Sequence, residues 1–361
     1  MKLSHIISAI EEYAPLSLQE KWDNSGLQVG LPPEADGECT GALLCVDVTP
    51  EVIDEAVRRG CNLVVSHHPL LFKGLKRLAG RTLAERAVAS AVRAGMAVYS
   101  SHTALDSTRG GVSCEMAHLL GATPVGVLAP AACTDLLVRV TCRRTVAGDV
   151  RLILLNADSA GCDYFDIDGE KANSPEAPDF PANIVCHEPL CRVEARVEAG
   201  AVSRILGALR DMPQSDSLRV ELLALDGASD LYGLGVIATY DNPVSMVALA
   251  TLVKERFHRN CFRAGGGYDP AAKVTRIALC GGSGGEFIGH AAAAGAQVYI
   301  TADVRYHDFV DNASGSMAIF DIGHFESEKC AKDIFYRVIK NKFPNFAVYY
   351  SEIESNPVIY L

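Results

Sequence analysis

Ser66-His67-His68-Pro69-Leu70-Leu71-Phe72 places two adjacent imidazoles directly after a short apolar run, Cys61 to Val65. The β-branched run predicts a strand buried on both faces, and Pro69 cannot continue a strand ladder. The histidines therefore lie at the carboxyl end of a strand, which is where ligands bind in open α/β sheets. We interpret the pair as half of a metal site; the alternative is a hydrogen-bonded pair of structural histidines.

Length and charge limit the possible classes of protein. The chain has 361 residues, more than one hydrophobic core usually serves, and 49% of them are hydrophobic, so we expect two or three globular domains. The formal charge of −11 predicts no nucleic-acid partner, because affinity for phosphate backbones comes mainly from clustered Lys and Arg.

The sequence also predicts a cytoplasmic protein. Residues 1–5 lead into an amphipathic pattern rather than a signal peptide, and no apolar run approaches the roughly 18 residues of a membrane span. The twelve cysteines are scattered without a CxxC pair, so we interpret them as reduced thiols, with a structural zinc site as the lesser alternative.

Strand and helix patterns alternate in the two outer parts of the chain, which predicts right-handed crossovers and mostly parallel sheets. In the first part we expect strands at 41–48, 62–66 and 96–100, and helices at 3–14, 50–59, 82–94 and 113–120. In the last part we expect strands at 233–239, 274–280, 296–301, 317–322 and 346–353, and helices at 244–257, 285–294, 305–312 and 327–340.

The middle of the chain has a different pattern. It carries β-type runs at 136–140, 151–155, 192–197 and 219–225, one helical pattern at 201–211, and a Pro-, Asp- and Glu-rich loop at 166–181. We expect a strand-rich α+β insert with its own small core. The predicted domains are a first α/β half at 1–129, the insert at 130–230, and a second α/β half at 231–361 that packs with the first.

The second half repeats the first. Ala42 to His68 aligns without a gap onto Ile277 to Asp303. With one residue's slip, the His-x3-carboxylate pair of His102 and Asp106 matches that of His324 and Glu328. Such a pair after the equivalent strand of each half is hard to ascribe to chance.

Together these side chains predict a site for two metal ions. The candidate ligands are His67, His68, Asp106, His324 and Glu328. Five N/O ligands exceed what one tetrahedral ion needs, and two ions about 3.5–4 Å apart would activate water for hydrolysis. Imidazole with carboxylate suits zinc, iron, manganese or nickel, so the sequence does not choose among these divalent metals.

Other polar residues are candidates for supporting roles. His102, His307 and Glu326 are the predicted proton donors or acceptors. His102, Asp303 and Asp321 could instead orient ligands through hydrogen bonds. The turn Gly281 to Gly285 could bind a phosphate, or it could only be the tight turn that the repeat demands.

These residues resemble the NIF-three-like family, the dinuclear metal-centre hexameric proteins often named GTP cyclohydrolase type 2 homologues. The motifs that carry the resemblance are Trp22 to Leu27, Ser66 to Pro69, His102 to Asp106, Thr301 to His307 and Gly323 to Glu328. The resemblance implies that His67, His68, Asp106, His324 and Glu328 hold two metals, that the chain forms a toroidal homohexamer, and that the insert is ferredoxin-like, similar to PII and CutA proteins. Met212-Pro213-Gln214-Ser215 stands where such inserts usually have His-Pro-Tyr-Glu.

Two functions follow from this resemblance. One is a metal-dependent hydrolase acting on a nucleotide or related ring, similar to GTP cyclohydrolase type 2. The other is a metal-binding adaptor or metal-handling protein without catalysis, in which the insert binds partners. When one metal-ligand residue is substituted, a hydrolase should lose turnover, whereas an adaptor should lose a partner.

Overall fold

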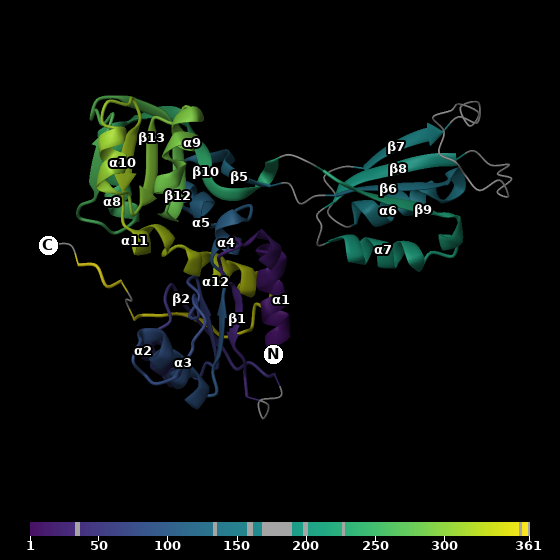
Figure 1. The fold of residues 1–361 in the computed structure, drawn as a ribbon, viewed down its shortest axis with the longest axis horizontal. Coiled ribbons are helices and arrows are strands. Elements are labelled where there is room, and N and C mark those ends of the chain that lie inside the picture. The colour runs from purple at the N-terminus through teal and green to yellow at the C-terminus, as the bar shows by residue number, and fades with distance from the viewer. Residues whose placement is uncertain are drawn as a thin grey trace. The chain divides into compact units, whose positions relative to one another are not determined.

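The computed structural model describes residues 1–32, 37–132, 136–156, 162–167, 190–197, 201–225, 228–353 and 356–359 (Figure 1). The chain divides into two compact units, Met1–Ala131 with Asp230–Leu361, and Ala132–Ser229. No helix among the described residues is long and apolar enough to cross a membrane. Each of the ten described cysteines is a free thiol.

The first half of the chain forms a five-stranded sheet in the order β1-β4-β3-β2-β15. The central strands β2 (Ala42–Cys45), β3 (Leu63–Ser66) and β4 (Ala97–Ser100) are parallel and fully buried, as their apolar runs predict. Strand β15 (Val348–Tyr350) joins β2 in parallel, and β1 (Gly26–Val29) pairs with β4 in antiparallel. Helices α2 (Pro50–Arg58) and α3 (Leu83–Arg93) cover one face of this sheet.

The second half repeats this arrangement in a six-stranded sheet of order β11-β14-β13-β12-β10-β5. Strands β12 (Lys273–Ser283), β13 (Val298–Ala302) and β14 (Ala318–Asp321) are parallel, and β11 (Arg263–Gly266) pairs antiparallel with β14, as β1 does with β4. Strands β10 (Ala228–Ser245) and β5 (Thr123–Ala132) extend the other edge. Helices α9 (Ile288–Ala293) and α10 (Tyr306–Asp311) cover the outer face.

One hydrophobic core joins the two halves. Leu44 and Tyr99 of the first sheet and Leu279 and Phe320 of the second belong to the same buried cluster. Helices α1 (Leu3–Tyr13), α5 (Val112–Leu119), α8 (Met246–Arg256) and α12 (Ala331–Lys342) contribute to it. Burying a large apolar side chain in this core stabilises the fold by about 1.5–3 kcal/mol. Because both sheets contribute to the same core, the halves form one α/β unit.

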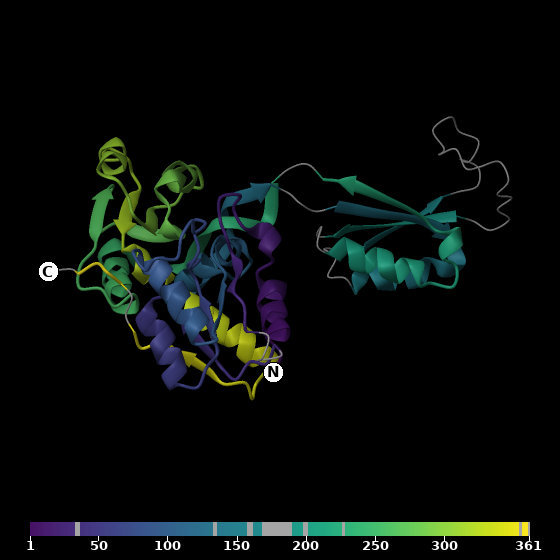
Figure 2. The same cartoon turned by 60° about the horizontal axis from the view of Figure 1, so that its bottom comes forward.

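The insert has a separate core and a four-stranded antiparallel sheet of order β7-β8-β6-β9. Its elements run β6 (Leu136–Arg143), α6 (Ala147–Leu155), β7 (Cys162–Ile167), β8 (Leu190–Val197), α7 (Val202–Arg210) and β9 (Arg219–Ala224). Figures 1 and 2 show both helices on one face of the sheet, and alternate residues of β8 are buried accordingly. This β-α-β-β-α-β order is the one that a ferredoxin-like insert requires; the likeness to PII and CutA proteins stays a prediction.

One predicted element of the insert is wrong. Residues 151–155, expected to be a strand, end helix α6. The apolar run was misleading because Val150 and Leu154 face the core one turn apart, whereas Leu152 and Leu155 are exposed. Residues 168–181 of the predicted loop lie outside the described residues.

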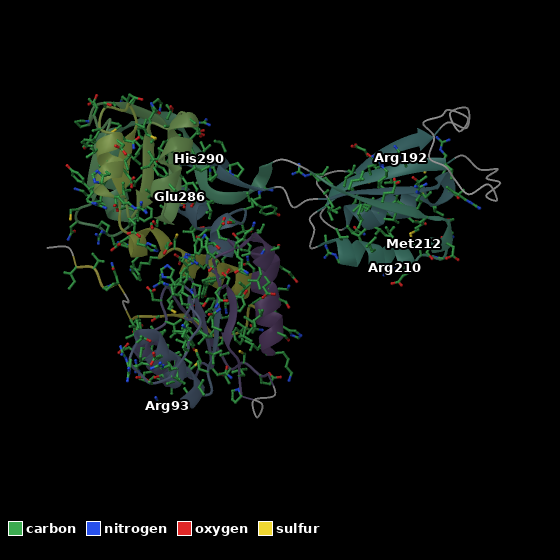
Figure 3. The ribbon with its side chains drawn as sticks, viewed as in Figure 1. Arg93, Arg192, Arg210, Met212, Glu286 and His290 are labelled. Carbon is green, nitrogen blue, oxygen red and sulfur yellow. The ribbon has the colours of Figure 1, made fainter. Side chains whose placement is uncertain are left out.

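Met212, at the end of α7 beside Arg210 (Figure 3), is a buried member of the insert's core. A packing residue therefore stands where inserts of the kind that the sequence resembles usually have the histidine of His-Pro-Tyr-Glu.

Candidate metal centre

Three segments that follow strand ends supply the side chains of the centre. His67 and His68 follow β3, and His102 follows β4 and precedes the short helix α4 (Thr103–Ser107), which carries Asp106. In the second half, helix α11 (His324–Glu328) begins three residues after β14. Strands β3 and β4 belong to the first sheet and β14 to the second, so the centre lies where the carboxyl ends of parallel strands of two sheets meet, and residues far apart in sequence come together there.

Glu328 lies between two sets of imidazoles. Its Oε2 is 2.7 Å from His68 Nε2 and 3.0 Å from His324 Nε2. Its Oε1 is 3.6 Å from His67 Nε2, which is 3.7 Å from Asp106 Oδ1. Two groups of possible ligand atoms, His68-His324-Glu328 and His67-Asp106-Glu328, therefore share this carboxylate.

Two buried atoms test whether a cation fits between these groups. His67 Nε2 and Asp106 Oδ1 are buried and have no hydrogen-bond partner. His67 Nδ1 lies 3.0 Å from the carbonyl oxygen of Ser101, which can only accept, so Nδ1 carries a hydrogen and Nε2 is the nitrogen that faces the centre. A buried ring nitrogen that has no hydrogen-bond partner and faces two carboxylates suits a cation between them, so the residues present fit a metal ion.

Carboxylates orient three other imidazoles in the same way. Asp47 lies 2.7 Å from His68 Nδ1, Asp303 lies 2.7 Å from His324 Nδ1, and Asp23 lies 2.9 Å from His102 Nδ1. In each case Nε2 is left to face the centre, which is the arrangement that metal-binding imidazoles use.

Burial and neighbouring charged groups together set the pKa values in the centre. Burial alone would lower the pKa of His68, but hydrogen bonds to Asp47 and Glu328 raise it to about 10. Burial likewise opposes charge on His324, yet Glu328 and Asp303 raise its pKa to about 9. Burial raises the pKa of Asp106, whereas for Glu328 the neighbouring imidazoles outweigh burial and lower the pKa. In the metal-free protein, protons shared with Glu328 thus take the place of a cation.

The glycine-rich turn makes room for Glu328. Gly282 has φ +64°, and a Cβ there would lie 2.2 Å from Glu328 Oε1 and 3.4 Å from His324 Nε2. Its N–H donates to Ser327 Oγ at 2.9 Å. This close approach accounts for a glycine in the turn without a bound phosphate.

The structure brings His67, His68, Asp106, His324 and Glu328 together, and His102 lies with His67 and His68 in a third group of possible ligand atoms. Asp303 orients His324, as one interpretation of the sequence held, but Asp321 instead bonds to Arg263 and to the N–H of Val304.

The other two predicted proton-transfer residues lie apart from these groups. Glu326 pairs with Arg259 at 2.6 Å and accepts from Asn356 at 2.8 Å, on the wall of a cavity of about 580 Å³ beside His68 and His324. His307 is exposed on α10, in ring contact with Tyr306.

Sequence reasoning assigned no role in the site to Asp47 or Asp23. Asp47 follows the end of β2 by two residues, so the strand-end argument that found His67 could have found it. Asp23 lies in a loop before β1, and no strand pattern marks it.

A family model described as Duf34/NIF3 (NGG1p interacting factor 3) matches residues 1–357. The chain belongs to the Duf34/NIF3 family. Among curated relatives, the GTP cyclohydrolase 1 type 2 homolog of Staphylococcus aureus (strain MSSA476) is 26% identical over 374 residues, covering 100% of both chains. That of Bacillus subtilis (strain 168) is 27% identical over 376 residues, covering 99% of this chain and 98% of its own.

Solved structures of NIF3-related proteins share the fold. The Bacillus cereus protein related to NIF3 superposes with a TM-score of 0.82 at 27% identity, covering 100% of this chain and 99% of that one. Staphylococcus aureus protein SA1388 gives 0.77 at 25% identity with the same coverage.

Proposed function

We propose that this chain is a metal-dependent hydrolase acting on a nucleotide or a related ring, with two divalent ions per chain. The observation that carries the proposal is the division of ligand atoms around Glu328, whose two oxygens face different imidazoles. The name GTP cyclohydrolase 1 type 2 homolog, borne by relatives, supports a nucleotide substrate. Divalent ions held there would lower the pKa of water and polarise the atom that it attacks.

The chain's own residues supply orientation and proton transfer. Asp47 and Asp303 fix the imidazoles of His68 and His324, so these ligands need no reorganisation when a substrate arrives. His102 is held by Asp23 through Nδ1, which leaves Nε2 to accept or release a proton at the centre. Glu326 is paired with Arg259 rather than with a ligand of the centre, so we assign it to the wall of the cavity.

We propose further that the protein works in the cytoplasm as a homo-oligomer, a toroidal hexamer as the family resemblance implies. Light scattering of the purified protein would measure six chains per particle if this is correct.

Metal analysis combined with a hydrolysis screen tests the function. We expect two ions per chain after saturation, and slow hydrolysis of GTP that a chelator abolishes and divalent metal restores. His68→Ala should abolish turnover with a native circular-dichroism spectrum, whereas His118→Ala, an exposed histidine on α5, should change nothing. A metal content of one ion per chain that does not change in Glu328→Ala would contradict the proposal that two ions share Glu328. A fully metallated protein without hydrolysis, or with equal hydrolysis in His68→Ala, would favour the adaptor function.

A further inference from the structure

Two exposed aromatic rings lie next to His102, beside the candidate metal centre. Trp22, the only tryptophan, is 58% exposed and Phe72 is 46% exposed, with ring centroids 5.9 Å apart. Both contact the ring of His102, at 5.8 Å and 6.2 Å. His102 in turn lies 5.3 Å from the ring of His67. A line of rings therefore leads from the surface to the candidate ligands.

Hydrogen bonds fix the two loops that carry these rings. Asn24 Nδ2 donates to the carbonyl oxygen of Leu71 at 2.7 Å, and the N–H of Leu71 donates to Gln28 Oε1 at 3.1 Å. These bonds tie the loop that carries Trp22 to the loop that carries Phe72. Asp23, next to Trp22, accepts from the N–H and hydroxyl of Thr103 at 3.0 Å and 2.6 Å. Exposed rings fixed in this way lose little entropy when they bind a flat ligand.

A basic loop begins directly after Phe72. Residues 73–81 are all exposed and contain Lys73, Lys76, Arg77 and Arg81 but no Asp or Glu. The carboxylate of Glu85 accepts from the backbone N–H groups of two residues at the end of the loop, Ala79 and Arg81, which leaves the loop with a net positive charge. Among the described residues, none of these four cations forms an ion pair with an acidic side chain. This positive loop is not apparent from the net charge of −11, which sums over the whole chain. Such a loop attracts anions to the aromatic pair.

We propose that Trp22 and Phe72, whose ring planes are inclined at 52°, form an aromatic platform that holds the planar ring of a nucleotide by the face of one ring and the edge of the other, and that the loop 73–81 binds its phosphates. This inference rests on the proposed function and names the subsite of that same centre. Stacking on an aromatic side chain and attraction to unpaired cations are the two interactions that a nucleotide offers together. A neutral ring would use only the platform, and inorganic polyphosphate only the loop.

Binding to the metal-free protein tests the inference separately from catalysis. With chelator present, GTP, guanosine and inorganic tripolyphosphate are titrated while the fluorescence of Trp22 is recorded; as the sole tryptophan it reports on this site alone. We expect saturable quenching by GTP and guanosine. Phe72→Ala should weaken both by about 5- to 150-fold, the range that one stacking contact supplies.

Charge reversal tests the loop. Lys76→Glu with Arg77→Glu should weaken GTP and tripolyphosphate but not guanosine. Lys254→Glu with Arg256→Glu, two exposed cations on α8, is the matched control and should leave all three affinities unchanged.

Four results would overturn the inference. Two concern the ligand itself: no quenching by GTP, or an unchanged GTP affinity in Phe72→Ala. Two point to another occupant: a single-stranded oligonucleotide that binds more tightly than GTP through the same residues, or a change of particle mass in Phe72→Ala, which would mark a second copy of the chain.

Nucleotide binding without hydrolysis by the metallated protein would refute the proposed function and leave this subsite standing. Hydrolysis with a KM that is unchanged in Phe72→Ala would support the proposed function and refute the nucleotide subsite.

Discussion

Glu328 decides the arrangement of the centre, because each of its oxygens faces a different set of imidazoles while the side chain itself is almost fully buried. A carboxylate in that position cannot move without uncovering an unpaired charge, which is costly in a buried site. The neighbours that fix it are therefore as important as the ligands themselves. Gly282 and Ser327 lie on one side of it, and His68 on the other.

Gly282→Ala should empty the centre without unfolding the chain. The new Cβ would meet Glu328 Oε1 at 2.2 Å in a left-handed backbone conformation, so the carboxylate must shift. We expect metal content per chain to fall by at least half at saturation. Gly289→Ala in α9, where a Cβ meets nothing within 4 Å, is the control and should keep its metal. Full metal content in Gly282→Ala would show that Glu328 can move without loss.

Asp303→Asn should weaken metal binding while preserving the fold. Asp303 has φ +54°, which Asn also tolerates, and its carboxylate holds His324 Nδ1 at 2.7 Å. Loss of that charge should lower metal affinity about 10- to 100-fold. Competition with a chromophoric chelator measures it, with Asp311→Asn, an exposed carboxylate of α10, as the comparison. Equal affinities would mean that orientation of His324 does not depend on Asp303.

The strand-end argument found most of the residues that the structure brings together, because each follows the carboxyl end of a parallel strand in one of the two sheets. Asp47 also follows a strand end, that of β2, so the same argument extends to it. Asp23 could not be found in this way, since a hydrogen bond between distant loops leaves no periodic pattern in a sequence.

At the scale of elements, the sequence predicted best where a periodic apolar pattern was long. The helices at 50–58 and 83–93 begin at Thr49 and Thr82, whose side chains accept from the N–H groups of Val52 and Glu85. Strand β11 escaped detection because Arg263-Ala264-Gly265-Gly266 has no apolar alternation and is defined only by its partner β14. The expected helix 327–340 is two helices, α11 and α12, and His324 and Glu328 lie four residues apart on the first of them, so their side chains face the same side.

Glu55 joins α2 to the segment after β15, and its substitution should destabilise the fold in a pH-dependent way. Its buried carboxylate accepts from Ser351 Oγ at 2.6 Å, the N–H of Glu352 at 3.0 Å and Arg59 Nε at 2.9 Å. Burial opposes the charge, but these donors lower the pKa of Glu55. Its contribution is therefore present above the unfolded-state pKa of about 4.3 and is lost as pH falls through the lower folded-state pKa.

Denaturant unfolding at several pH values checks this. Glu55→Gln should cost about 1–3 kcal/mol at pH 7, and the difference from the native chain should shrink below about pH 4.3. Asp54→Asn, exposed on the same helix, is the control and should stay within about 0.5 kcal/mol. A cost for Glu55→Gln that does not vary with pH would mean that the charge is not what the segment needs.

At the scale of the whole molecule, the internal repeat predicted two related sheets, and the structure adds how they are joined. The inner faces of both sheets and four helices share one core, so neither half encloses its apolar surface alone. The sequence could not show this, because a strand buried on both faces has the same apolar pattern whether a helix or another half covers it. The centre follows from that packing, since His68 comes from one half and Glu328 from the other.

The insert should be dispensable for metal binding. All five candidate ligands belong to the unit of 1–131 and 230–361, and the insert has a core of its own between Val138 and Met212. Strands β5 and β10, on either side of the insert in sequence, are neighbours in the six-stranded sheet, so a short linker can connect them. Replacing 134–226 with a Gly/Ser linker should therefore leave metal content per chain unchanged. Glu328→Ala in the shortened chain should lower it, which confirms that the retained metal occupies the centre. A shortened chain that folds, by circular dichroism and cooperative unfolding, but binds no metal would show instead that the insert supplies ligands or holds the two halves in register.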